Sequence, residues 1–163
     1  MLRSLATIFG DSLGGDLGWG AIVAFVAAWV IAQGWKFVVG MYLGKGQPMM
    51  QNFRTAVGYL TRSGGMPSGH SAWMTAATVY LGCYYGFTSG IFALAVASTG
   101  IVLYDAIHVR YAVGEQGKAL NKLLKKAGEP TLPVVEGHTI PQMIVGVMIG
   151  VIVGLGVYFL IAG

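Results

Sequence analysis

Charged residues are scarce in this sequence. Asp, Glu, Lys and Arg together make up only 10% of the 163 residues, whereas a soluble domain carries about a quarter. Cysteine is nearly absent as well, because Cys83 is the single example, and one thiol excludes an intramolecular disulfide. The composition therefore excludes an ordinary soluble domain, and it also excludes a fold held together by internal disulfides.

The sequence has instead a set of long apolar runs, which cover residues 19–43, 71–87, 88–107 and 143–162. A membrane-spanning helix needs about 20 mainly apolar residues. The run at 71–87 is short and suffices only if the residues before it lie at the interface. We expect an all-α integral membrane bundle of about four to five transmembrane helices. It forms a single domain over residues 1–163, and the fifth, shorter element lies near residues 2–9.

The most informative motif is Pro67-Ser68-Gly69-His70, which precedes the second apolar run. Pro67 suits the first turn of a helix, and the next three N–H groups then point out of a helix N-terminus, where phosphate binds. Gly69 allows close approach of the backbone, and His70 can give a proton to a leaving oxygen near neutral pH. The alternative interpretation is a glycine-rich turn that starts a helix, with His70 as a polar residue at the membrane interface.

A four-span topology brings the polar residues to one face of the membrane. That face receives Lys36, the Pro67–His70 motif, Asp105, His108, Arg110, Glu136 and His138. Ionisable residues in or beside spans tend to mark function. The alternatives are that Lys36 snorkels to the membrane surface and that Asp105 is a simple charge at the end of a span. Nine of the ten Lys and Arg residues lie on the same face. The positive-inside rule therefore predicts that this face lies in the cytoplasm. As the localisation, we expect a bacterial-type plasma membrane.

Two helical patterns predict contacts. Residues 114–127 set four lysines opposite a face of leucines, which is typical of a helix lying on an anionic membrane surface. Gly146, Gly150 and Gly154 are spaced by four in the last span, a pattern that favours close helix packing in lipid and suits a homodimer. The alternative is that glycine is simply frequent in spanning helices.

Together these features resemble a known family. The chain is similar to the divergent branch of the type 2 phosphatidic acid phosphatase superfamily, small membrane proteins related to acid phosphatases and vanadium haloperoxidases. The similar features are Ala32-Gln33 with Lys36, Gly64-Gly65-Met66-Pro67-Ser68 before His70-Ser71-Ala72, Tyr104-Asp105-Ala106, Val109-Arg110, Gly114 with Gln116, Leu120-Asn121 and Glu136-Gly137-His138-Thr139.

The resemblance implies a two-step phosphoryl transfer without metal or other cofactor, on a lipid phosphate or prenyl (pyro)phosphate in the bilayer. No nucleic-acid partner is expected. His70 is then the general acid and His138 the nucleophile. The phosphate is held by Lys36, Ser68, Gly69 and Arg110, with Arg62 as a weaker candidate. Asp105 either orients a histidine or pairs with Arg110.

The chain departs from the superfamily pattern at several positions, of which Gln142 and His108 bear most directly on the chemistry. Gln142 stands four residues after His138, where the superfamily has a carboxylate, and Asp105 or Glu136 are the candidates to replace that carboxylate. His108 stands where glycine is usual and is an alternative nucleophile. The leading interpretation is a membrane phosphatase. The alternatives are a catalytically weak or inactive regulatory protein that binds phosphate headgroups, and a small transporter.

Overall fold

The computed structural model describes residues 17–43, 66–134 and 137–163, and the regular structure in these ranges is entirely helical. The elements are η1 (Leu17–Trp19), α2 (Gly20–Leu43), α4 (Gly69–Tyr85), α5 (Gly90–Tyr104), the π-helical η2 (Asp105–Val109), α6 (Arg110–Ala127) and α7 (Ile140–Ile161). The all-α prediction is confirmed. The short element expected near residues 2–9 lies outside the described ranges.

Three of the helical segments are long and apolar enough to cross a membrane. They cover residues 17–36, 90–127 and 140–161. α4 has only 17 residues, as the shortness of its apolar run predicted. The fold is thus the membrane helical bundle expected from the sequence, and α4, unlike α5, does not continue into a longer helix.

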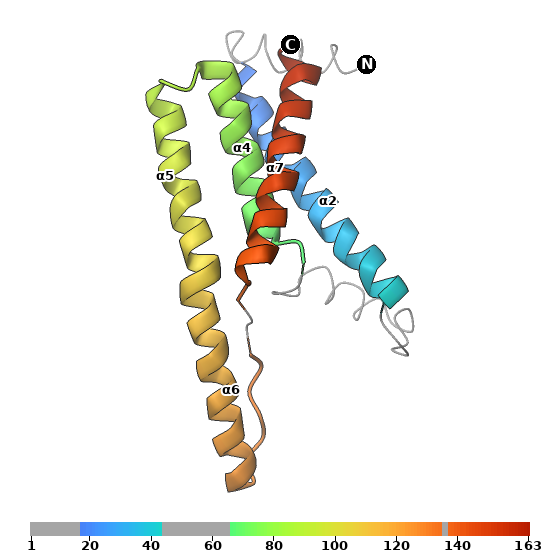
Figure 1. Ribbon diagram of the computed structural model, residues 1–163, viewed down its shortest axis with the longest axis vertical. Coiled ribbons are helices and arrows are strands. Elements are labelled where there is room, and N and C mark those ends of the chain that lie inside the picture. Colours follow the sequence, from blue (N-terminus) through green and yellow to red (C-terminus); the bar gives the residue numbers. More distant parts are fainter. Residues whose placement is uncertain (1–16, 44–65, 135–136) are drawn as a thin grey trace.

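α4 packs against both α2 and α7, which also contact each other, and small residues form the contacts (Figure 1). Ala24 and Ala28 of α2 and Ala72 of α4 are fully buried. A Cβ added at Gly150 would lie 2.5 Å from the carbonyl oxygen of Ala72, so α7 and α4 are in backbone contact there. The glycine stripe of the last span therefore packs within the chain. It is not the free surface on which a homodimer through this span was expected.

α5 packs on the other side of α4 and continues without a break into α6. The hydroxyls of Thr78 and Thr99 hydrogen-bond across the α4–α5 contact at 2.7 Å. The combined α5–η2–α6 helix has 38 residues, hence a length of about 57 Å at 1.5 Å per residue, against about 30 Å for the hydrocarbon core. α6 extends past the end of the bundle in Figure 1. The helix expected to lie flat on the membrane surface is instead a straight continuation of a spanning helix.

The chain after α6 turns back along the same helix. Gly128 ends α6 with φ 77°, a left-handed conformation that glycine adopts without strain. The side-chain amide of Asn121 then pairs with the backbone of Leu132, accepting its N–H at 2.8 Å and donating to its carbonyl at 2.9 Å. This contact holds the returning segment on α6 and leads the chain to the start of α7.

Candidate functional site

The Pro67–His70 motif forms the start of α4. Ser68 is the N-cap residue, and its Oγ accepts hydrogen bonds from the Ser71 N–H at 3.4 Å and the Ser71 hydroxyl at 2.8 Å. The N–H of Ser68 donates to the carbonyl of Gln142 at 3.1 Å. The Ser68 N–H is therefore committed to α7 and does not point out of the helix as the sequence suggested. The first-turn N–H groups of Gly69 and His70 are the ones with no acceptor inside the helix.

His70 lies within electrostatic range of four ionisable residues from other parts of the fold. Burial lowers the pKa of its imidazole, the positive charges of Arg110, His138 and Lys36 lower that pKa further, and the Asp105 carboxylate raises it. These residues come from α2, from the α5–α6 helix and from the segment before α7. Four of the polar residues that a four-span topology assigned to one face of the membrane thus lie within electrostatic range of His70, which is on that face as well.

Asp105 and Arg110 are brought together by the π turn between α5 and α6. The Arg110 N–H donates to the Asp105 carbonyl, five residues earlier, and the Arg110 Nε contacts the Asp105 carboxylate at 2.6 Å. Of the two roles expected for Asp105, pairing with Arg110 is the one the structure contains. Because this ion pair uses Nε, the two terminal amino groups of the guanidinium can serve an anion.

His138 is held against the same π turn. It is only 4% exposed, and its backbone N–H donates to the Ala106 carbonyl at 3.0 Å. Gly137 lies so close to α6 that an added Cβ would be 2.6 Å from the Tyr111 Cα. Glycine is required for this approach, and the approach brings His138 beside Asp105 and Arg110. The glycine directly before the histidine was the available sequence signal for this contact.

His108 and Gln142 lie differently from what the sequence suggested. His108 is exposed and stacks on Tyr104, with ring centroids 4.3 Å apart. The side-chain carbonyl of Gln142 accepts the Thr139 N–H at 3.0 Å, which caps α7. The amide oxygen at the position where the superfamily has a carboxylate is therefore engaged at the helix start. Arg62 and Glu136 lie outside the described ranges.

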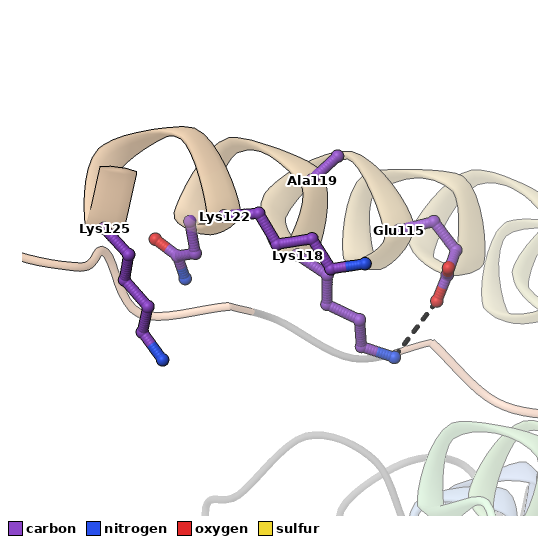
Figure 2. A pocket seen from close by; sticks show the side chains of 6 residues that line it. Glu115, Lys118, Ala119, Lys122 and Lys125 are labelled. Carbon is purple, nitrogen blue, oxygen red and sulfur yellow. Dashed lines mark hydrogen bonds and ion pairs between the residues drawn. The ribbon is translucent and has the colours of Figure 1, made fainter. Parts of the chain in front are cut away.

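Two hollows flank α6. A cavity of about 160 Å³ separates α6 from the start of α7 and is lined by Tyr111, Gly114, Glu115, Lys118, Gly137, Thr139 and Gln142. A wider groove of about 400 Å³ runs along the outer part of α6, where Lys118, Lys122 and Lys125 project (Figure 2). Lys118 pairs with Glu115 at 3.0 Å in this groove. Within the described ranges, no cluster of three His, Cys, Asp or Glu could hold a metal ion.

Comparisons with known proteins agree with the motifs. The family model of the divergent PAP2 family matches residues 20–153. An uncharacterized membrane protein of Bacillus subtilis (strain 168), YuiD, is 40% identical over 65 residues, which are 40% of this chain and 41% of that protein. The match thus spans less than half the length of this curated relative. No solved structure gives a significant match. Since the family model covers most of the chain, including every residue of the site described above, the protein belongs to the divergent PAP2 family.

Proposed function

We propose that this protein is a metal-independent membrane phosphatase that hydrolyses a lipid phosphate or prenyl (pyro)phosphate through a phosphohistidine. The observation that carries the proposal is the convergence of two histidines with Lys36 and Arg110 at one end of the bundle. Two imidazoles supply a nucleophile and a proton donor. The two cations supply the charge that stabilises phosphate oxygens in the transition state.

In the first step a nitrogen of the His138 imidazole attacks phosphorus. The P–N bond forms, the ester P–O bond breaks, and the leaving alkoxide takes a proton from the His70 imidazolium. In the second step water attacks the phosphohistidine and gives its proton to the now neutral His70. The P–N bond breaks, and inorganic phosphate and His138 are released.

The phosphate oxygens meet donors from three elements. Arg110 and Lys36 contribute charge, while the first-turn N–H groups of α4 contribute directed hydrogen bonds. The Ser68 hydroxyl, expected from the sequence as a further donor, is fully buried. Asp105 acts through Arg110, because their 2.6 Å contact fixes the guanidinium. Its negative charge also offsets part of the positive field at His70.

A membrane substrate suits this position. Met66, directly before the motif, and Val109, beside Arg110, are 48% and 49% exposed. Apolar side chains at the rim of the site favour a substrate whose chains stay in lipid while its phosphate enters from the side. This supports a lipid or prenyl phosphate over a free sugar phosphate.

The test is phosphate release by the detergent-purified protein in the presence of EDTA. The substrates are phosphatidic acid, phosphatidylglycerophosphate and prenyl (pyro)phosphates. The wild type is expected to release phosphate, and His138→Ala to lose about 10³-fold or more in kcat. His108→Ala is the matched control, because His108 is exposed and stacked on Tyr104, and it is expected to retain activity. Activity in His138→Ala together with loss in His108→Ala would reverse the assignment of the nucleophile.

One observation favours a second candidate, a headgroup-binding protein with little or no turnover. Gln142 stands where the superfamily has a carboxylate, and its amide is used to cap α7. Asp105 in turn is paired with Arg110. If saturable binding of phosphatidic acid vesicles occurs without phosphate release from any substrate, the binding function replaces the phosphatase.

A further inference from the structure

We propose that two copies of this chain associate through an exposed, mainly apolar stripe on α6. The stripe consists of Val113, Gln116, Leu120, Leu123 and Ala127, all of which are exposed. None of these residues was assigned a task in the phosphate site. The inference is therefore independent of the phosphatase chemistry.

The spacing of the stripe is that of a two-stranded coiled coil. Its members follow one another at intervals of three, four, three and four residues, which is the heptad spacing of a and d positions. Val113, Leu120 and Ala127 are then at a positions, and Gln116 and Leu123 at d positions. Such a stripe fits an identical stripe on a second helix, and its one polar residue, Gln116, favours a single alignment of the two.

The leucines of the stripe lie in water, beyond the bilayer. α5 and η2 have 15 and 5 residues and together span about 30 Å, the thickness of the hydrocarbon core. From the start of α6, Leu120 and Leu123 lie about 15 Å and about 20 Å farther along the axis, whereas the headgroup layer is only about 5–8 Å thick. They are 45% and 64% exposed. Burial of these side chains against a partner is therefore favoured by the hydrophobic effect.

The rest of the described chain leaves the stripe open. α6 extends past the bundle, and the segment that returns from its end runs beside it (Figure 1). This segment packs on the neighbouring face of α6, where Leu132 bonds to Asn121 and Val134 lies against Gly117. The stripe is thus available to a second chain without any change in the fold.

Charge favours a second copy as the partner. Lys118, Lys122 and Lys125 project into the groove on another face of α6 (Figure 2), so the lysines of two copies do not meet when their stripes pair. Up to the last turn of α6, the positions that flank the stripe are uncharged, namely Ala112, Gly117, Ala119 and Leu124. The repulsion expected between two identical basic helices is therefore absent from this face.

The membrane brings two such helices together in the correct way. α6 continues a spanning helix without a break, so two copies inserted with the same orientation present their stripes parallel and at the same height. Confinement to one membrane also raises the effective concentration of the second copy. A stripe of two heptads is short for a coiled coil in solution, and tethering to the bilayer compensates for this length.

The test is disulfide formation in isolated membranes, with Cys83→Ala as the background. In a parallel pair each residue of the stripe faces its counterpart. Leu120→Cys and Leu123→Cys are therefore expected to form a covalent dimer of twice 17.2 kDa under mild oxidation. Lys118→Cys and Lys122→Cys are the matched controls, because they are exposed positions of the same helix, and they are expected to give about tenfold less dimer. Equal yields on the two faces, or no dimer from the stripe, would overturn the proposal.

A second substitution tests whether contact between the stripes holds the pair together. Leu123→Glu in the Leu120→Cys background sets two like charges against each other and is expected to lower the yield of dimer about tenfold. Lys122→Glu changes the charge of the adjacent position on another face and is expected to leave the yield unchanged. An unchanged yield in Leu123→Glu would contradict pairing through the stripe. A cross-linked product of another mass in place of the dimer would assign the stripe to a different protein.

Discussion

At the scale of single residues, the surroundings of His70 determine the pKa of its imidazole. The imidazole lies at the first turn of α4, ahead of the apolar segment. Burial and the cations around it lower its pKa from the usual 6.5. In the empty site His70 is therefore neutral at a pH where an exposed histidine is still partly charged. In the proposed mechanism, the negative charge of a bound phosphate would oppose that field, so the substrate would restore the protonated form that a general acid needs.

This reasoning predicts a pH profile. A general acid must be protonated, and a lowered pKa means that protonation is lost at lower pH as the pH rises. The alkaline limb of kcat/KM, which reports the free enzyme, is expected below pH 6.5. The alkaline limb of kcat, which reports the complex, is expected at higher pH because bound phosphate raises the pKa of His70.

Steady-state profiles of the wild type and His70→Ala check this prediction. The alkaline limb should be missing in the variant, because the titrating group has been removed. His70 would be excluded as the acid if the alkaline limb of kcat/KM lay at or above pH 6.5 in the wild type. It would also be excluded if this limb were unchanged in His70→Ala.

Sequence reasoning was effective for the chemical identity of residues and weak for their partners. The motifs singled out His70, Asp105, Arg110 and His138, and the structure brings these four into one region. The bond from the Ser68 N–H to the Gln142 carbonyl was not predictable. It depends on the separation of two helices, which no local pattern encodes. Gln142 was interpreted through its spacing from His138, whereas its position in the first turn of α7 determines its contact.

At the scale of the helices, the glycines of α7 set the distance to α4. Gly150 lies against the Ala72 carbonyl, and an alanine Cβ there would be 2.5 Å from that oxygen and 2.6 Å from the Thr75 Cβ. Gly156 is in the same helix but has open space around its Cβ position. The two positions therefore separate packing from the intrinsic helix preference of glycine.

Gly150→Ala is expected to lower the free energy of unfolding by about 1–3 kcal/mol, because the helices must move apart. Gly156→Ala is expected to leave it unchanged or raise it by up to about 1 kcal/mol, because alanine is the better helix former. Chemical denaturation of both variants in one detergent measures the difference. Equal effects would mean that the glycine stripe is not the contact that determines α4–α7 packing.

The helices also show where local patterns fail. Long apolar runs identified the apolar helices of the described ranges, because a helix that crosses lipid needs about 20 mainly apolar residues. The sequence from Asp105 to Val109 carries no signal for a π turn, yet the turn places Arg110 over Asp105. Amphipathicity correctly identified a basic face on residues 114–127. It says nothing about the direction of the helix axis, and so α6 was expected flat on the membrane.

At the scale of the whole molecule, the fold has two different ends. The turn between α4 and α5 lies at one end, and α6 with its lysines lies beyond the other (Figure 1). The site is at the α6 end, because η2 and the start of α4 carry its residues. The concentration of positive charge at that end favours a cytoplasmic orientation.

Cysteine labelling in cells checks this orientation. In a Cys83→Ala background, Lys122→Cys on α6 and Thr88→Cys at the α4–α5 turn both offer exposed positions. A membrane-impermeant maleimide is expected to label Thr88→Cys in intact cells and Lys122→Cys only after permeabilisation. The reverse pattern would place the site outside the cell. Labelling of both from one side would contradict the crossing of the membrane by α5.

The continuous helix from Gly90 to Ala127 has a mechanical consequence. Its first half, α5, is packed on α4, and its second half, α6, extends past the bundle. Asp105 and Arg110 lie near the junction of the two halves, and the His138 N–H is hydrogen-bonded to the Ala106 carbonyl of the same helix. A force on α6 would therefore tilt these three residues together, while His70 and Ser68 would stay with α4. Force applied about 25 Å away, by the 1.5 Å rise per residue, would thereby change the gap between His138 and His70, the nucleophile and the general acid of the proposed mechanism.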